Sequence, residues 1–359
     1  MKKLEDYLKY EQPTKYIVDS EKYSNEYDIP VLTAGKSFIL GYTNEKNNIF
    51  PKEELPVIIF DDFTTDCKYV DFPFKVKSSA MKILRPINNA NAKFLYYYMK
   101  NIRFDSTLHK RYWISEYSQL SIKELNSKMQ DEFANKMQKL EKLIELKNKQ
   151  LQECNNLIKS QFVEMFGDPV INDREWNIDE INNVAPVKNY RGEFDSNKVW
   201  LLNLDMVESN SGKVIEYLYE DINNIGNSTC SFSEDNVLYS KLRPYLNKVV
   251  IPDKKGFATS EMVPLLPRKE KLNKVFLTYL LRSNSFVDYI SVKVSGAKMP
   301  RVIMEEFRKF KVILPPIELQ NKFAMIVEQI DKQKFVNANL LQLLVKNLKR
   351  CYNNIIGFR

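Results

Sequence analysis

The sequence Gln-Asp-Glu-Phe-Ala at residues 130–134 recurs, with two changes, as Gln-Asn-Lys-Phe-Ala at residues 320–324. The two copies lie 190 residues apart, and each opens a segment in which apolar residues recur at alternating steps of four and three. A 3.5-residue spacing sustained over about four heptads is the pattern of a coiled-coil seam. We therefore expect two long helices, and their pairing decides the fold.

The two apolar ladders correspond position by position at the same offset of 190 residues. The first consists of Phe133, Met137, Leu140, Ile144, Lys147, Leu151, Cys154, Ile158, Gln161 and Met165. The second consists of Phe323, Val327, Ile330, Lys334, Asn337, Leu341, Leu344, Leu348, Cys351 and Ile355. Eight of the ten positions are apolar in each ladder, whereas a hydrophobic content of 44% predicts roughly half as many. We expect these apolar residues to form the coiled-coil seam.

Both ladders carry a polar residue at the same step, Lys147 in the first and Asn337 in the second. A lone polar residue in a seam costs stability and usually fixes the register of the helices. In an antiparallel pair centred near this step, the two side chains should lie close together. The alternative is a pair of unrelated surface helices, which explains neither the constant offset nor the shared polar step.

The composition describes a basic chain of 359 residues, a length that suggests two or three domains. Lys and Arg number 54 against 46 Asp and Glu, a surplus that permits a nucleic-acid partner without proving one. The sequence has no apolar run long enough to span a membrane, and because its first residues turn acidic before any apolar run we expect no signal peptide. Its four cysteines are far apart, so we expect a cytoplasmic protein with reduced thiols and no membrane association.

Short β-rich runs bounded by turn residues predict a mixed α/β module before each long helix. In the first module they lie at 29–32, 37–40, 55–60, 72–76 and 81–84, and a short helix is expected at 91–99. In the second they lie at 199–204, 236–239 and 248–251, and a helix is expected at about 271–283. The modules resemble each other, because Ser79 matches Ser260 and the segment 94–97 matches 276–279.

The repeat unit is therefore a module followed by a long helix, used twice. We expect a first module at 1–122, a first helix at 123–167, a second module at 168–315 and a second helix at 316–359. Gly167 should cap the first helix, and Pro315 with Pro316 should give the second a stiff start. Because the chain must return from the second module, the helices should run antiparallel. The expected fold is α+β, a pseudo-twofold dumbbell with a rod about 60 Å long.

Most catalytic motifs are missing from the sequence. A single histidine, His109, excludes paired-histidine zinc sites, and no Cys-x-x-Cys pair occurs. The glycine spacing fits neither a Walker A loop nor Gly-x-Gly-x-x-Gly. The pair Asp61 and Asp62 could hold a metal, but such a lone pair is more often a turn or a cap. We expect no catalytic residue, no metal and no cofactor in this chain.

Basic and aromatic side chains interleave in several segments that we expect to be loops. Lys and Arg neutralise phosphates, and Arg also reads base edges. The candidate DNA-binding residues are Lys36, His109, Lys110, Arg111 and Tyr112 in the first module, and Arg191, Lys241, Arg243, Tyr245, Lys248, Lys298 and Arg301 in the second. The alternative for any single cluster is a solvated charged surface, but a cluster recurs at a matching place in each module.

Three longer segments are distinctive: Ser-Gln-Phe-Val-Glu-Met-Phe-Gly-Asp-Pro at 160–169, Val-Leu-Tyr-Ser-Lys-Leu-Arg-Pro-Tyr-Leu-Asn-Lys at 237–248 and Ile-Leu-Pro-Pro-Ile-Glu-Leu-Gln at 313–320. With them the chain resembles, over essentially its whole length, the specificity subunits of type I restriction–modification enzymes. In the first module, the segments 30–36 and 60–65 resemble one branch of the family's recognition domains. That module lacks the Lys-x-Arg-Pro-Tyr turn, which fits two modules that read different sequences.

The resemblance implies that each module is a target recognition domain for one half of a bipartite site on double-stranded DNA. It implies that the long helices act as a spacer and dock two modification subunits, which carry S-adenosylmethionine. Restriction subunits, which use ATP and Mg, would join that core, and this chain would be non-catalytic. The alternatives are a coiled-coil adaptor without DNA specificity and an enzyme that uses a metal at Asp61 and Asp62.

Overall fold

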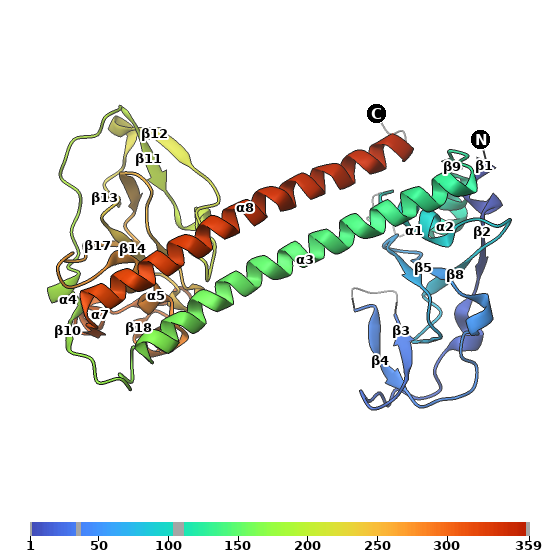
Figure 1. Ribbon diagram of the computed structural model, residues 1–359, viewed down its shortest axis with the longest axis horizontal. Coiled ribbons are helices and arrows are strands. Elements are labelled where there is room, and N and C mark those ends of the chain that lie inside the picture. Colours follow the sequence, from blue (N-terminus) through green and yellow to red (C-terminus); the bar gives the residue numbers. More distant parts are fainter. Residues whose placement is uncertain (1, 34–36, 103–110, 357–359) are drawn as a thin grey trace. The chain divides into compact units, whose positions relative to one another are not determined.

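The computed structural model describes residues 2–33, 37–102 and 111–356, and Figure 1 shows its elements. The candidates Lys36, His109 and Lys110 lie outside the described residues. The chain divides into two compact units, which we call unit 1 (Met1–Asn148 and Asn339–Arg359) and unit 2 (Lys149–Ala338). Each unit therefore combines one module with half of each long helix.

The described residues of unit 1 form two sheets of three or four strands and one two-stranded pair. The first is antiparallel and has the order β2-β8-β5-β6, with β2 at Leu8–Glu11, β8 at Met81–Pro86, β5 at Val57–Asp61 and β6 at Cys67–Val70. In the second, β3 (Ile29–Leu32) pairs antiparallel with β4 (Ile39–Thr43) and parallel with β7 (Lys75–Val76). The remaining elements are β1 (Lys2–Lys3), which pairs with β9 (Ser121–Ile122), and the helices α1 (Ala92–Lys100) and α2 (Tyr112–Ser115).

Strand β5 explains how one short run supports two cores in unit 1. Successive side chains of a strand point to opposite faces. Ile58 and Phe60 belong to the core that contains α1, α2 and part of α3, whereas Val57 and Ile59 belong to the core on the opposite side. Because both faces are covered, the strand is apolar almost throughout, which is why its sequence predicts it so clearly.

In unit 2 the described residues form two sheets of three or four strands and two two-stranded pairs. The larger sheet has the order β12-β11-β16-β13, with β12 at Leu218–Asp221, β11 at Lys198–Leu202, β16 at Gly256–Thr259 and β13 at Thr229–Phe232. Among these described pairs only β11 and β16 are parallel. The smaller is antiparallel in the order β15-β14-β17, with β15 at Val249–Val250, β14 at Val237–Ser240 and β17 at Met262–Leu265. Two short pairs join β10 (Ile178–Glu180) to β20 (Lys311–Ile313) and β18 (Val294–Ser295) to β19 (Arg301–Val302).

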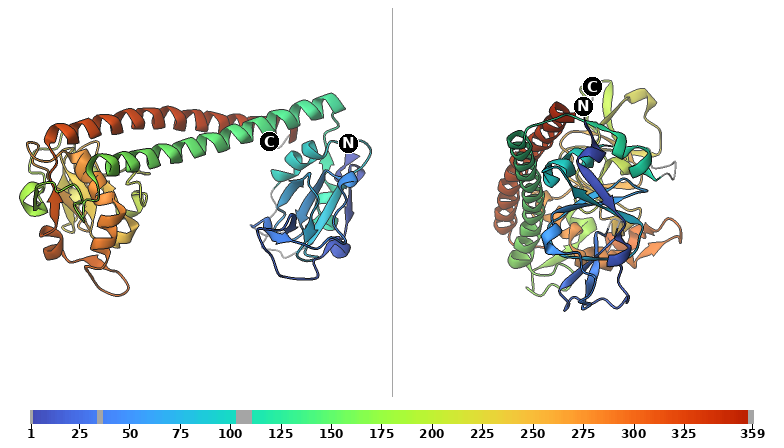
Figure 2. Two further views of the ribbon diagram at one scale, coloured as in Figure 1. Left: turned by 60° about the horizontal axis from the view of Figure 1, so that its bottom comes forward. Right: turned by 90° about the vertical axis from the view of Figure 1, so that its right-hand side faces the viewer.

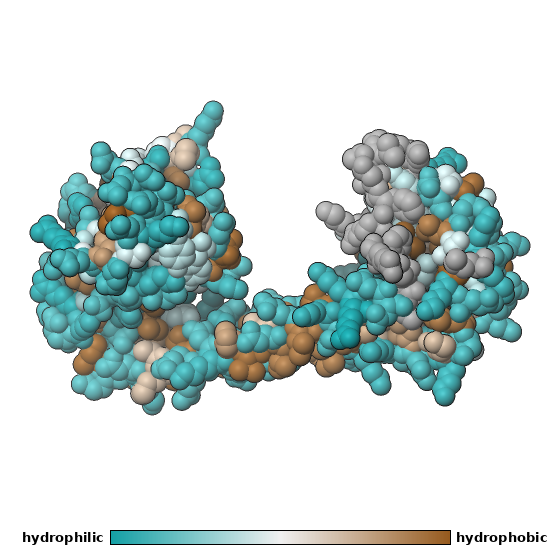
Figure 3. Space-filling view, turned by 90° about the horizontal axis from the view of Figure 1, so that it is seen from above, coloured by the Kyte–Doolittle hydropathy of each residue, from teal (hydrophilic) through white to brown (hydrophobic). Residues whose placement is uncertain are grey.

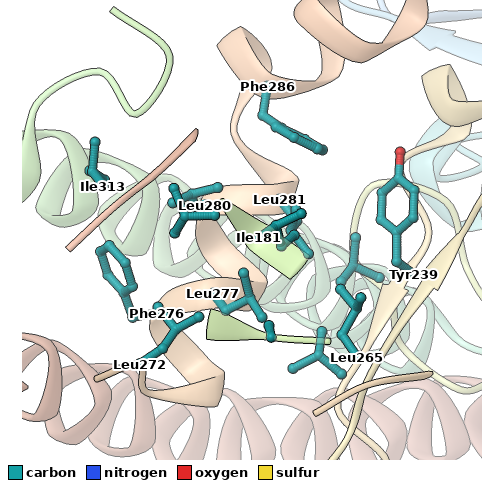
Figure 4. Packing of buried hydrophobic residues seen from close by; sticks show 14 of the residues in the cluster. Ile181, Tyr239, Leu265, Leu272, Phe276, Leu277, Leu280, Leu281, Phe286 and Ile313 are labelled. Atoms are coloured by element: carbon teal, nitrogen blue, oxygen red, sulfur yellow. The ribbon is translucent and has the colours of Figure 1, made fainter. Parts of the chain in front are cut away.

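The helices of the second module are α4 (Ile181–Val184), α5 (Lys274–Arg282), α6 (Asn284–Ser291) and α7 (Met304–Arg308). Figure 4 shows α5 placing Leu277, Leu280 and Leu281 into a core shared with Tyr239 of β14 and Leu265 of β17. The predicted helix at 271–283 therefore ends at Arg282, where Ser283 caps a second helix by accepting a hydrogen bond from the backbone N–H of Phe286.

The two long helices are α3 (Ser127–Phe166) and α8 (Ile317–Ile356), each of 40 residues. The helix α3 begins at Ser127, four residues after the expected segment start at 123. Residues 121–122 form β9, and the side chain of Asn126 accepts a hydrogen bond from the backbone N–H of Met129 at 2.9 Å, which caps the helix there. At its other end Gly167 has φ +74°, which confirms the predicted left-handed cap.

Burial along the long helices follows the two sequence ladders. All ten positions of the first ladder are buried or half-buried, as are the nine positions of the second whose side chains are described. Within unit 1, Phe133 near the start of α3 lies edge-on to Tyr352 near the end of α8, with 6.3 Å between ring centroids. Within unit 2, Phe162 near the end of α3 lies edge-on to Phe323 near the start of α8, at 5.5 Å. Tyr352 and Phe162 are themselves 190 residues apart, so the same contact occurs twice with the helices exchanged.

The mixture of helices and strands confirms the predicted α+β class. The sequence did not predict β2, β6, β12, β13 or β16 as separate strands. Within the described residues, no helix combines the length and the apolar character that crossing a membrane requires.

Candidate nucleic-acid interface

The loop after β14 presents the basic-aromatic segment 241–248 in an unusual backbone conformation. Arg243 has φ 51° and ψ 65°, Asn247 has φ 50° and ψ 55°, and a single 3-10 turn at Pro244–Leu246 lies between them. The left-handed region disfavours side chains other than Gly, Asn and Asp, and such residues concentrate at functional sites. Arg243 and Tyr245 are both exposed, Tyr245 to 54%.

This loop is held against the β18–β19 hairpin, which projects from the body of unit 2 in Figure 2. The backbone N–H of Arg243 donates to the carbonyl of Pro300 at 2.8 Å, and the N–H of Val302 donates to the carbonyl of Lys241 at 2.9 Å. Leu242 and Arg301 form an antiparallel bridge between the two segments. The structure therefore brings together the segments of four candidates that are about sixty residues apart in sequence: Lys241, Arg243, Lys298 and Arg301.

Segments 241–245 and 296–301 together form what we call the double loop. Its positive charge is partly balanced by Glu261. The guanidinium Nε of Arg301 donates to Oε1 of Glu261 at 3.0 Å, and the N–H of Lys241 donates to the carbonyl of Glu261 at 3.0 Å. Arg243 and Lys298 are exposed, and Arg301 keeps 44% of its side chain exposed. Exposed cations on adjacent loops are suited to binding phosphate or base-edge acceptors.

Lys248 does not offer its ammonium at this surface. Its Nζ donates to the backbone carbonyl of Leu204 at 2.6 Å, and partial burial lowers the pKa of Lys248. The adjoining Asn247 is buried, and its side-chain amide donates to the carbonyl of Arg282 at 3.0 Å. These two residues anchor the base of the loop, and the exposed Arg243 and Tyr245 lie between them and β14.

Arg191 lies on a different loop of unit 2, which is fixed to β13. The N–H of Tyr190 donates to the carbonyl of Ser231 at 3.1 Å, and the hydroxyl of Ser231 donates to the carbonyl of Tyr190 at 2.7 Å. Arg191 itself is exposed. It remains a candidate contact, but none of the hydrogen bonds named above joins its loop to the double loop.

In unit 1 the segment 111–113 has a largely structural role. Tyr112 and Trp113 are each 2% exposed and pack in the core of α2. The N–H of Trp113 donates to Oδ1 of Asp62 at 2.8 Å, so that this carboxylate caps the helix. A ring so deeply buried cannot contact DNA, so Tyr112 is corrected to a core residue. Arg111 is exposed and remains a candidate.

The pair Asp61 and Asp62 is used for structure. Oδ1 of Asp61 accepts hydrogen bonds from the N–H groups of Phe63 at 2.9 Å and Thr64 at 3.2 Å, which is an Asx turn. Oδ2 of Asp62 lies 3.3 Å from Nζ of the buried Lys82. In the described parts of the chain, no group of three or more His, Cys, Asp and Glu side chains could hold a metal ion.

An exposed aromatic-basic patch at the start of β12 was not predicted from the sequence. Tyr217 and Tyr219 are 43% and 48% exposed. Nζ of Lys254 lies 4.6 Å from the ring centroid of Tyr217 and donates to the hydroxyl of Tyr219 at 2.9 Å. The alternation Tyr-Leu-Tyr at 217–219 is the signal that could have identified it, because alternate residues of an edge strand share one face.

Unit 2 also has an open pocket of about 950 Å³ bordered by α3, the loop 208–213, the α5–α6 junction and α8. Arg282 in its wall donates to the carbonyl of Val249 and lies 5.6 Å from the ring centroid of Tyr279. Burial lowers the pKa of Arg282. This guanidinium therefore holds β15 against α5.

Comparison with known proteins identifies the family of this chain. The family described as "Type I restriction modification DNA specificity domain" matches residues 173–345. The chain is 31% identical over 353 residues to the type I restriction enzyme EcoR124I/EcoR124II specificity subunit of Escherichia coli, covering 91% of this chain and 85% of that protein. It is 28% identical over 151 residues to the Escherichia coli EcoDI specificity subunit, covering 42% of this chain and 32% of that protein.

Among solved structures, the S subunit of a type I restriction–modification system from M. genitalium superposes with a TM-score of 0.63. The match covers 99% of this chain and 95% of that one at 13% sequence identity, and it therefore supports the fold alone. The sequence relationship supports more, since it extends over nine-tenths of the chain at above 30% identity. The chain belongs to the family of type I restriction enzyme specificity subunits.

Proposed function

We propose that this specificity subunit reads a bipartite site on double-stranded DNA, with the module of each unit binding one half. The observation that carries the proposal is the duplicated contact of Phe133 with Tyr352 in unit 1 and of Phe323 with Phe162 in unit 2. Two modules joined to the same helices by equivalent contacts are suited to reading two sequences at a fixed separation. A single reader would need neither the second module nor the second junction.

The long helices serve as the spacer. In unit 1 the start of α3 contacts the end of α8, and in unit 2 the end of α3 contacts the start of α8, which supports an antiparallel pair. The buried ladder positions support a coiled-coil seam. A 40-residue helix is about 60 Å long, and equivalent major-groove faces of B-DNA recur about every 34 Å, so the pair is long enough to separate two readers by a helical turn.

In unit 2 the reading surface is the double loop formed by segments 241–245 and 296–301. Arg243 and Lys298 supply exposed cations, and Tyr245 supplies an exposed ring. In unit 1 Arg111 is the described candidate. Cations of this kind bind phosphates, and Arg can also bind guanine with two hydrogen bonds.

The helices also dock two modification subunits, and restriction subunits join that core. Apolar side chains are exposed on α3 and α8, as the brown patches along the long helices in Figure 3 show. They include Leu157, Phe335 and Val336 in unit 2 and Leu143 and Leu340 in unit 1. Exposed apolar surface of this kind marks protein interaction sites.

The chain itself is non-catalytic under this proposal, and the partner subunits bring S-adenosylmethionine, ATP and Mg. We place it in the cytoplasm, where thiols stay reduced. Cys67, Cys154 and Cys230 are buried and free, and burial raises the pKa of the Cys67 thiol to about 12. Inert buried thiols fit that compartment.

The salt dependence of duplex binding tests the proposal against a coiled-coil adaptor. The subunit, assembled with its modification subunits, is titrated with a duplex that contains the methylated site at several salt concentrations. If the complex makes four phosphate contacts, the logarithm of its binding constant falls with the logarithm of the salt concentration with a slope of about −3.6. Affinity should therefore fall about a hundredfold between 50 and 200 mM salt. A flat dependence, or no duplex binding at low salt, contradicts a DNA reader and favours the adaptor.

A further inference from the structure

The side chain of Gln320 links the second module to its long helix in unit 2. Gln320 is fully buried in the first turn of α8. Its Oε1 accepts a hydrogen bond from the backbone N–H of Asn273 at 2.9 Å, and its Nε2 donates to the carbonyl of Pro315 at 2.8 Å and of Lys271 at 3.1 Å. The amide therefore uses both ends to join the start of α8 to the segment that precedes α5.

The same link occurs in unit 1 at the other copy of the motif. Oε1 of Gln130 accepts a hydrogen bond from the backbone N–H of Asn91 at 3.2 Å, and its Nε2 donates to the carbonyl of Leu125 at 2.8 Å. Asn91 precedes α1 as Asn273 precedes α5, and both module helices have nine residues. Two modules that differ in their reading loops thus share an equivalent attachment.

The asparagine in each link has two roles. Oδ1 of Asn273 accepts from the N–H of Val275 at 2.8 Å and caps α5, while its Nδ2 donates to Oδ1 of Asn321 at 2.8 Å. Oδ1 of Asn91 accepts from the N–H of Phe94 at 2.8 Å, while its Nδ2 donates to Oδ1 of Asp131 at 2.5 Å. In unit 2 three such hydrogen bonds join the first turn of the long helix to Asn273 and Lys271 before α5. In unit 1 two join it to Asn91 before α1.

We infer that Gln130 and Gln320 are positioning residues that hold each module at one angle on its long helix and thereby set the gap between the DNA half-sites. The inference rests on the proposed function. A rotation of about 10° at this link moves a surface about 20 Å away by about 3.5 Å, close to the rise of one base pair. A loosened link should therefore admit sites whose gap is wrong by one base pair.

Glutamine meets both requirements of the link. Leucine has a similar size but neither accepts nor donates. Glutamate keeps the acceptor and places a second oxygen against the carbonyls of Pro315 and Lys271. Gln329 is exposed on the same helix and provides a matched Gln→Leu control. Leu265→Ala, in the core of β17 and outside the link, provides a control for loss of stability alone.

The test measures gap selectivity with the assembled complex of this chain and its modification subunits. The native site is mapped by sequencing methylated DNA, and affinities are measured for duplexes with the native gap and with gaps one base pair shorter and longer. We expect Gln320→Leu, Gln320→Glu and Gln130→Leu each to reduce the preference for the native gap on the order of fivefold, because buried hydrogen bonds that fix the angle are lost. Base preferences within each half-site should stay unchanged.

The controls separate positioning from stability. Leu265→Ala should lower the melting temperature and leave the gap preference unchanged, and Gln329→Leu should change neither. If the link variants lower the melting temperature and keep the native gap preference, the inference is wrong and the link is structural only. If the unsubstituted complex itself shows no gap preference, the proposed function fails instead. Gln130 is half-buried and in the other unit, so its variant decides the matter if Gln320→Leu does not assemble.

Discussion

Arg243 is the residue whose local structure departs most from ordinary backbone geometry at the candidate interface. Its φ of 51° is held by an N–H bond to the carbonyl of Pro300 and by the 3-10 turn that follows. The left-handed backbone conformation of an arginine is disfavoured by a free energy of order 1–2 kcal/mol. The loop therefore contains a strained residue, and the side chain of that residue is exposed.

Substitution of Arg243 by alanine should weaken binding at one half-site only. Loss of a base-edge contact costs about 1–3 kcal/mol, or about tenfold to a hundredfold in the dissociation constant. The measurement compares duplexes in which each half-site in turn is scrambled. Discrimination should fall only for the half-site that unit 2 reads.

The matched control is Arg308→Ala, which removes an exposed arginine from α7 of the same unit. It should leave affinity unchanged. A uniform loss across all duplexes with Arg243→Ala would make Arg243 a phosphate contact, and no loss at all would remove the double loop from the interface.

At this scale the sequence indicates where basic and aromatic residues cluster but not which of their side chains are exposed, and DNA binding by these segments stays a prediction. Tyr112 and Arg111 are adjacent, yet one is buried and the other exposed, because α2 turns its aromatic face to the core. Lys248 shares a segment with Arg243 but donates to a buried carbonyl. Composition identifies a basic-aromatic run, and only the fold decides which of its members reaches solvent.

The long helices are the elements that the sequence predicted best. Their apolar residues keep a 3.5-residue spacing over about four heptads, which is too long to be confused with a strand or a short helix. Gly167 and Pro316 mark a helix end and a helix start as expected. Strands β12, β13 and β16 were missed because they are short and rich in Tyr, Ser, Thr and Gly, and their pairing comes from distant segments.

Insertions test the helices as a spacer. Seven residues inserted after Asn148 in α3 alone keep the heptad phase of α3 but offset it from α8, so binding to the native site should be lost. Matched insertions of seven residues after Asn148 and after Ala338 lengthen both helices by about 10 Å. The preferred gap should then increase by about three base pairs, as measured by selection from a library of gap lengths.

A three-residue insertion at both positions is the control, since it interrupts the heptad phase and locally overwinds the pair, so it should weaken binding rather than simply lengthen the preferred gap. Native-gap binding that survives the single seven-residue insertion would contradict the spacer. An unchanged preferred gap after the matched insertions would contradict it equally.

At the scale of the whole molecule, the offset of 190 residues is enough to reveal the duplication from the sequence alone. The offset does not indicate where the compact units divide. The boundaries fall inside α3 and α8, because Phe133 and Tyr352 complete a core of unit 1 while Phe162 and Phe323 complete a core of unit 2. The four-segment division of the chain and the proximity of Lys147 to Asn337 stay predictions.

The two modules and the two long helices should together read two short DNA sequences at a fixed separation. This separation can be measured by footprinting the complex of this chain and its modification subunits on DNA that carries the methylated site. We expect two short protected sequences separated by a gap whose length is constant and whose bases can be changed without loss of affinity. A single continuous protected sequence, or equal binding to all DNA, would contradict the proposed function.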